Sequence, residues 1–213
     1  MDKWGDHGLV CSCHGDRTVR HNCVRNLVYE DAAIAGLRPI REKAGLLPGR
    51  PADDGLKLSN ALRRPADVWV PRGLQGDAEA FDFAICSGMR NDIFRDSASV
   101  PEAAIQQYEE FKKNFKRTED ACRDVGLRFT PVVLEAHGGG WGGSLRGVVD
   151  WIAKATATLH NERESVVSAK IAQRIASTLQ RENARAILRR SPAPEPGIVS
   201  SGWENFREEA IWQ

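Results

Sequence analysis

Two aspartates, Asp67 and Asp82, stand within short apolar stretches, Ala-Asp-Val-Trp-Val and Phe-Asp-Phe. A buried, unpaired carboxylate is costly, so each needs a partner, a hydrogen-bond network or a metal ion. If the two stretches are neighbouring strands, both acids can converge on one point. Carboxylate oxygens suit Mg²⁺ or Mn²⁺, which keep several waters and also take substrate phosphate. The pair therefore predicts metal-dependent phosphodiester hydrolysis, and the alternative is that each aspartate is a turn or capping residue at a strand end.

A lysine normally completes such a site, because its ammonium orients the attacking water or offsets charge on the phosphate. Lys112 and Lys113 are the nearest candidates along the chain, and Lys116 follows Lys112 one helical turn later. The alternative reading of this basic run is a solvated helix face.

The bulk composition is that of an ordinary globular domain, with 213 residues, of which 41% are hydrophobic and 28% charged. This length is expected to give one domain with a sizeable core. Without a long apolar run or a signal peptide, we expect no membrane span, an intracellular location and reduced cysteines. The net charge of +1 neither favours nor excludes nucleic acid, but basic residues cluster at 63–64, 112–117 and 181–190.

Hydrophobic periodicity predicts the elements that must position these residues. We expect a helix over 20–36, an edge strand within 37–45, a long loop over 46–64, and strands over 66–70 and 80–86 that form a hairpin. A long helix from Pro101 to Gly126 is expected to bury Ile105, Tyr108, Phe111, Phe115, Cys122 and Val125. A strand over 129–135, a glycine-rich turn, helices over 144–160 and 163–190, and a linker-like tail complete the chain. This order predicts an α/β fold with a mixed central β-sheet flanked by helices.

The order and spacing of several short motifs resemble those of a known nuclease family. They are Arg64-Pro65-Ala66-Asp67, Asp82 after 14 intervening residues, and Tyr108-Glu109-Glu110-Phe111-Lys112. This pattern resembles the PD-(D/E)xK nucleases, and more specifically the restriction-endonuclease-like domain at the C-terminal end of non-LTR retrotransposon reverse-transcriptase polyproteins. The stretches 17–22 and 131–139 are also similar to that kind of tail, so the resemblance spans about residues 4–190.

The resemblance implies a role for each matching residue. Asp67 would be the first metal ligand, Asp82 the second, and Lys112 a catalytic lysine displaced onto the helix, with Glu30 and Glu135 as supporting acids. It implies a restriction-endonuclease-like fold with a helical C-terminal extension, Mg²⁺ or Mn²⁺ as cofactor, DNA and also RNA of the element as partners, and a nuclear location. Two departures matter: the family's Pro-Asp is here Pro-Ala-Asp, and Ala84 occupies the position of the usual lysine.

A cluster of cysteines and histidines occupies the first 23 residues. His7, Cys11, Cys13 and His21 are candidate Zn²⁺ ligands, since thiolates and imidazoles at close spacing bind zinc tetrahedrally. The related tails carry a zinc knuckle before the nuclease, but the upstream cysteine pair of that motif is not in this chain. The alternative is that these residues are ordinary reduced thiols and polar histidines.

The predicted organisation is a partial zinc-knuckle-like segment (1–23), a nuclease domain (24–160), a C-terminal helix (161–190) and a flexible tail (191–213). The predicted function is metal-dependent nicking of target DNA. Two alternatives remain open: a catalytically inactive remnant that only binds nucleic acid, and a decayed fragment. The glycine turn over 138–143 lacks the lysine and serine of a phosphate-binding loop, so no nucleotide cofactor is expected.

Overall fold

A computed structural model describes residues 6–10, 15–48, 65–138 and 140–190. A mixed sheet of four strands forms the centre, in the order β1-β2-β3-β4. The strands are β1 (Ile40–Arg41), β2 (Val68–Val70), β3 (Glu79–Cys86) and β4 (Arg128–Glu135). The β1–β2 and β2–β3 pairs are antiparallel, and β3 and β4 are parallel. The predicted α/β class, mixed sheet and hairpin are confirmed, while the predicted edge strand over 37–45 shrinks to two residues.

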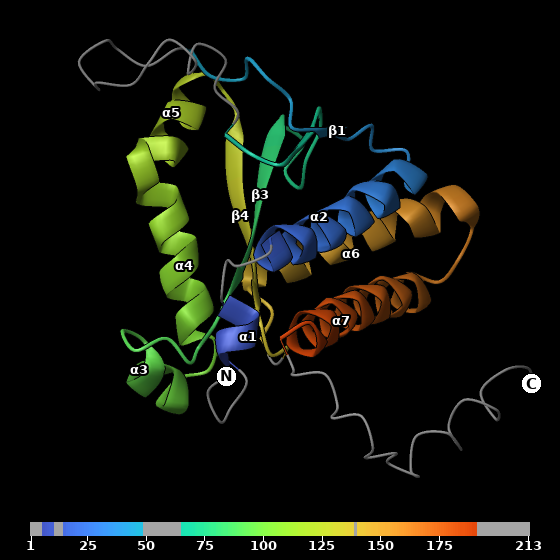
Figure 1. The fold of residues 1–213 in the computed structure, drawn as a ribbon. Coiled ribbons are helices and arrows are strands. Elements are labelled where there is room, and N and C mark those ends of the chain that lie inside the picture. The colour runs from blue at the N-terminus through green and yellow to red at the C-terminus, as the bar shows by residue number, and fades with distance from the viewer. Residues whose placement is uncertain (1–5, 11–14, 49–64, 139, 191–213) are drawn as a thin grey trace, which may run out of the picture.

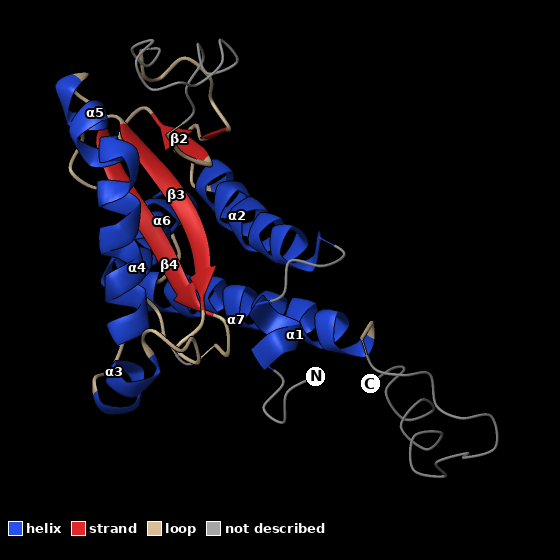
Figure 2. Ribbon diagram, turned by 60° about the vertical axis from the view of Figure 1, so that its left-hand side comes forward, coloured by secondary structure: helices blue, strands red, loops and turns tan. Residues whose placement is uncertain are grey.

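The helices cover both faces of the sheet (Figures 1 and 2). Helices α4 (Ala103–Asn114) and α5 (Thr118–Asp124) lie on one face, and α2 (Asp16–Ile34), α6 (Gly143–His160) and α7 (Glu164–Leu188) lie on the other. Two short helices, α1 (Asp6–Val10) and α3 (Phe94–Ser99), lie near the end of the sheet at which β3 and β4 finish. The result is a three-layer arrangement with the sheet in the middle.

The main core lies between the sheet and the layer of α2, α6 and α7. Phe81 and Phe83 of β3 project into it, together with Val132 and Leu134 of β4. Val24, Leu27 and Val28 of α2 are buried there, as are Ile171 and Ile175 of α7. Val166 and Leu188 of the same helix are exposed, at 36% and 71%.

Side chains alternate along β3, so the opposite face carries Ala80, Asp82 and Ala84. Ala80 and Ala84 belong to the smaller clusters beneath α5 and α4. Because their methyl groups are small, α4 can pack close to the strand at this point. A polar side chain on α4 can therefore reach Asp82.

The long helix predicted over 101–126 is wrong in one respect, because it is broken in the middle. After α4 a short 3₁₀ segment, Phe115–Arg117, intervenes before α5. Lys116 and Arg117 have positive φ angles of 54° and 52°, a left-handed conformation that an α-helix cannot contain. The break changes the direction of the chain, so one continuous apolar stripe is impossible: Ile105 and Cys122 are buried, whereas Phe111, Phe115 and Val125 are about half exposed.

The described residues include no helix whose length and apolar character would let it cross a membrane. Residues 49–64 of the predicted loop and the predicted tail from 191 lie outside the described part of the chain.

Candidate active site

Asp67 lies directly before β2 and is bound to β3 by two hydrogen bonds. Its backbone N–H donates to the Phe81 carbonyl at 3.0 Å. Its side-chain Oδ2 accepts the Phe83 N–H at 2.8 Å. Regular pairing of β2 with β3 ends at Val68 and Phe81, so the Phe83 N–H has no backbone acceptor in β2. The Asp67 carboxylate accepts its hydrogen bond instead, and buried backbone donors need such a partner. Because Phe81 and Phe83 flank Asp82 in sequence, both aspartates sit at the same point of the sheet.

Asp82 of β3 forms an ion pair with Lys112 of α4. The Lys112 Nζ lies 2.8 Å from Asp82 Oδ2, and the two side chains are only 22% and 18% exposed. Ala84, the residue at the usual lysine position, leaves this face of the strand uncrowded and is itself buried. The ammonium therefore comes from the helix across the sheet face rather than from the strand.

His21 of α2 contacts the other aspartate. Its Nε2 lies 3.3 Å from Asp67 Oδ1, so the two carboxylate oxygens of Asp67 have different partners, one a ring nitrogen and the other the Phe83 amide. His21 lies in the second turn of α2. His21 was predicted as a zinc ligand, and the structure instead places it against Asp67.

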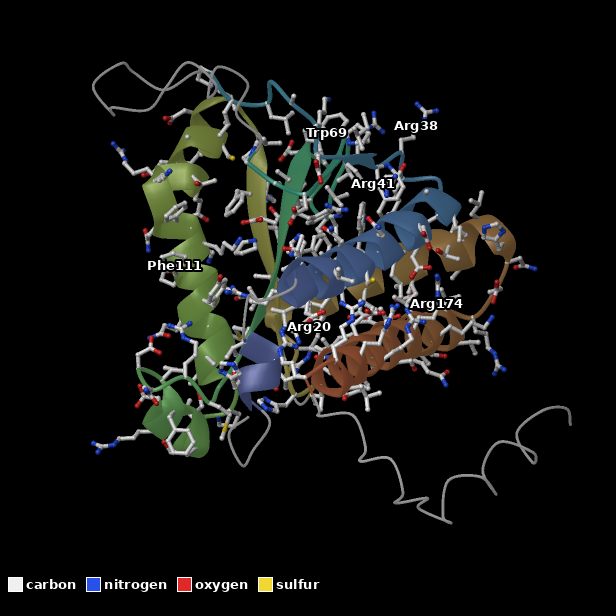
Figure 3. The ribbon with its side chains drawn as sticks, in the orientation of Figure 1. Arg20, Arg38, Arg41, Trp69, Phe111 and Arg174 are labelled. Atoms are coloured by element: carbon white, nitrogen blue, oxygen red, sulfur yellow. The ribbon has the colours of Figure 1, made fainter. Side chains whose placement is uncertain are left out.

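A buried polar network holds the beginning of α2 in place. Asp16 pairs with Arg189 and Arg190 at 2.7 and 2.8 Å. Arg20, only 3% exposed, donates to the Asn183 side chain at 2.8 Å and to the Leu9 carbonyl. Arg20 lies between α2 and α7 (Figure 3). These contacts join α1, α2 and α7, and they fix the turn of α2 that carries His21.

The two aspartates have pKa values shifted in opposite directions. Burial alone would raise the pKa of Asp67, but the His21 contact, the Phe83 N–H and the Lys112 charge outweigh it and lower that pKa below the usual value. Burial raises the pKa of Asp82, and the negative charge of Asp67 adds to the rise while Lys112 opposes it. Because the charge of Asp67 acts on Asp82, the two carboxyl groups titrate as a pair, and Asp67 loses its proton first.

A cavity of about 420 Å³ opens over this group. Asp67, Asp82 and Lys112 line it, and Arg17, Thr18, Arg20 and His21 of α2 form its other wall. Tyr108 of α4 also contributes to the lining. Cationic side chains therefore surround two carboxylates, an arrangement that suits a phosphate bound beside a cation.

Two carboxylates, Asp67 and Asp82, are the side chains at this site that could hold a metal ion. Within the described ranges, no group of three or more His, Cys, Asp or Glu side chains could hold a metal ion. Mg²⁺ in phosphoryl-transfer sites is typically held by one or two carboxylates, with waters and substrate phosphates completing its shell. Asp67 and Asp82 would be those two carboxylates.

Two predicted supporting acids lie elsewhere. Glu30 is farther along α2, where its carboxylate lies 3.7 Å from Arg174 of α7. Glu135, at the end of β4, contacts His137 Nδ1 at 2.9 Å and accepts the His137 N–H. It lines a separate cavity of about 470 Å³ that is bordered by α3 and α4. The structure therefore unites Asp67, Asp82 and Lys112 but brings neither glutamate to them.

The predicted zinc ligands are not gathered where the structure describes them. His7 lies in α1, His21 contacts Asp67, and Cys11 and Cys13 lie outside the described residues. Cys122 is a core residue, as predicted, and Cys86 is also buried.

Sequence reasoning missed the contribution of α2 to the cavity. Arg17, Thr18 and His21 lie within the stretch 17–22 that resembles retroelement tails, but only a zinc role was considered for His21. The useful signal was the helical spacing of Arg17, Arg20 and His21, which places all three near the first turns of one helix.

Comparison with known proteins identified no matching family model and no similar curated protein.

Proposed function

We propose that this chain is a metal-dependent DNA endonuclease whose site consists of Asp67, Asp82 and Lys112. The observation that carries the proposal is the 2.8 Å approach of the Lys112 ammonium to Asp82. The resemblance to PD-(D/E)xK nucleases requires a lysine beside the second acid, and the strand offers only Ala84 at that place. A lysine supplied by α4 removes the main objection to catalysis that the sequence raises.

Each residue has a definite part in this proposal. Asp67 and Asp82 would hold Mg²⁺ or Mn²⁺, which when bound supplies Lewis-acid activation of water and charge neutralisation at the phosphate. The Lys112 ammonium stabilises negative charge that develops on the phosphate as the P–O bond breaks. Arg17 binds a phosphate oxygen of the substrate strand, and His21 and the Phe83 amide keep the Asp67 carboxylate in one orientation and ionised.

The substrate we propose is DNA, nicked by hydrolysis of one phosphodiester bond, with RNA of the element as a further partner. The mixed sheet with helices on both faces is compatible with a restriction-endonuclease-like fold, which we propose as the finer classification. A role in target cleavage by a retroelement polyprotein in the nucleus follows from the resemblance of residues 4–190.

Conversion of supercoiled plasmid to the nicked circle tests this proposal. The full chain is expected to nick with Mg²⁺ or Mn²⁺ and to stop when the metal is chelated. Asp67→Asn and Asp82→Asn should each abolish nicking, and the asparagine at 67 keeps an acceptor for the Phe83 N–H, so the fold is preserved. Salt-sensitive DNA binding without nicking under any divalent metal would refute the enzyme and favour the alternative of an inactive nucleic-acid-binding domain.

A further inference from the structure

Three aromatic rings form a continuous stripe along α4 into the 3₁₀ segment. The ring centroids of Tyr108 and Phe111 are 5.7 Å apart, and those of Phe111 and Phe115 are 5.4 Å apart. Phe111 is 52% exposed and Phe115 48% exposed. We call these three residues the aromatic stripe. Figure 3 labels Phe111 on α4, on the side of the sheet away from α2 and α7.

The exposure of the aromatic stripe is not explained by packing within the chain. Single exposed apolar residues are common and need no explanation, but contiguous exposed rings mark interaction surfaces. The aromatic stripe ends at a backbone break, where Lys116 and Arg117 have positive φ angles. The left-handed conformation of these two residues is unfavourable for side chains other than glycine, and such strain often marks functional segments.

The aromatic stripe begins at the candidate active site. Tyr108 lines the cavity that holds Asp82 and Lys112. Phe111 and Phe115 then lead away from this cavity along the same helix. A polymeric ligand with one phosphate group in the cavity can therefore extend over the rings with its next units.

Cations accompany the rings. Lys113 and Lys116 lie next to the rings in the sequence, and the Lys116 Nζ is 5.2 Å from the centre of the Phe115 ring. Lys112 and Arg117, in the same stretch, pair with Asp82 and Asp120. The nearest exposed acid on the helix, Glu110, accepts a hydrogen bond from Asn114. Rings that alternate with lysines suit a ligand that is both flat and anionic, whereas an apolar protein partner would leave the lysines unmatched.

The rings can take bases from a single strand but not from a closed duplex. Bases in duplex DNA cover each other's faces, so their faces become available only where the strand is opened. The rings contact one another at tilted angles of 52° and 40°, so a base can stack only on an exposed outer face of a ring and not between two rings. Stacking of single bases on aromatic side chains, with cations along the backbone, is the usual mode of single-strand binding.

We propose that the aromatic stripe binds a single-stranded stretch of nucleic acid next to the phosphodiester bond that is cut. The inference deepens the proposed nuclease function and names the form of substrate that the site accepts: a strand opened beside the cleavage point. Phe111 and Phe115 stack bases, and the neighbouring lysines contact the phosphates.

Binding of a fluorescein-labelled oligo-dT to the full chain in chelator, without metal or cleavage, tests this inference. Phe111→Ala and Phe115→Ala should each weaken binding by roughly fivefold or more. Phe94→Ala is the matched control, because Phe94 is also 48% exposed but lies on α3, off the aromatic stripe. The control should bind as the wild type does, and a duplex of the same length should bind with little dependence on the stripe.

A second measurement uses the wild-type protein, so its result does not depend on whether a variant folds. An oligonucleotide containing 5-iodouracil is irradiated in complex with the wild-type chain, and cross-linked peptides are mapped by mass spectrometry. Cross-links at Phe111 or Phe115 support the proposal. Cross-links elsewhere, with unchanged affinity of both stripe variants, overturn it. A change only in self-association of the stripe variants also overturns it, in favour of a protein partner.

These outcomes separate the inference from the proposed nuclease function. Stripe-dependent oligonucleotide binding in a chain that never nicks DNA supports the inference and refutes the enzyme. Metal-dependent nicking that is insensitive to Phe111→Ala and Phe115→Ala, without cross-links to the stripe, supports the enzyme and overturns the inference.

Discussion

Replacement of Lys112 by methionine removes the ammonium but keeps most of the length of the side chain. In the structure this ammonium lies 2.8 Å from Asp82 Oδ2, with both side chains less than a quarter exposed. Coulomb attraction at this distance is about 6 kcal/mol with the effective dielectric constant of about 20 that suits partly buried pairs. Desolvation of both groups offsets much of that, so we expect a smaller net effect on the free energy of unfolding, about 1–3 kcal/mol.

Lys112→Met should affect the rate of nicking more than it affects the free energy of unfolding, because the lost charge stabilises the transition state. Loss of one preorganised group that stabilises developing negative charge costs about 10²- to 10³-fold in rate. Lys112→Met should therefore slow nicking of supercoiled plasmid by that factor. Lys112→Arg should recover part of the loss, since the charge returns with a different geometry.

Lys154→Met is the control, because it removes the same charge from an exposed position on α6 that does not line the cavity. It should keep near-normal nicking, and urea unfolding of all three variants will show whether the fold persists. If Lys112→Met nicks as fast as the wild type while remaining folded, the ion pair with Asp82 is structural and the assignment of the lysine is wrong.

Three further predictions concern the metal, the stability and the thiols. In calorimetric titration, Asp82→Asn should weaken Mn²⁺ binding by about tenfold or more. Unchanged affinity for Mn²⁺ would show that Asp82 is not a metal ligand. Arg174→Met should lower the free energy of unfolding by about 1–3 kcal/mol at neutral pH, because it leaves Asp31 buried without its partner. Burial already raises the pKa of Asp31, and loss of the arginine raises that pKa further. The difference in free energy of unfolding between wild type and Arg174→Met, measured in urea, should therefore shrink as the pH falls through that pKa. A difference that grows toward acidic pH would contradict this. Burial raises the pKa of Cys86 to about 12, so iodoacetamide at mildly alkaline pH should leave this thiol unmodified in the native chain and alkylate it in urea. Peptide mapping measures both, and equal modification under the two conditions would show that Cys86 is accessible in the native chain.

Local sequence patterns were sufficient to predict most elements of the fold. The two strands β2 and β3, their antiparallel pairing and the two C-terminal helices follow from apolar periodicity and from glycine and proline at the boundaries. The break at Lys116 and Arg117 could not be predicted, because neither residue disfavours helix by itself and positive φ there depends on tertiary packing. The predicted burial of Phe111 and Phe115 was wrong for the same reason.

The candidate site was predictable only in part. The two acids were found because charged residues within apolar strands need partners, and Lys112 because a lysine was missing from β3. The approach of His21 to Asp67 joins residues 46 positions apart and depends on how α2 is held against α7 by Asp16 and Arg20. Periodicity along one segment contains no information about such long-range contacts. The resemblance implied a supporting role for Glu30 and Glu135, and the structure places both away from the two aspartates.

The most direct test of the central claim compares two proteins purified identically, the wild-type chain and the variant that carries both Asp67→Asn and Asp82→Asn. The quantity measured is the initial rate of nicking of supercoiled plasmid in Mg²⁺. We predict that the wild type nicks, and that the double variant remains folded and binds DNA but does not nick. Equal nicking by both preparations, or none by the wild type in Mg²⁺ or Mn²⁺, would contradict the assignment of this site as a nuclease centre.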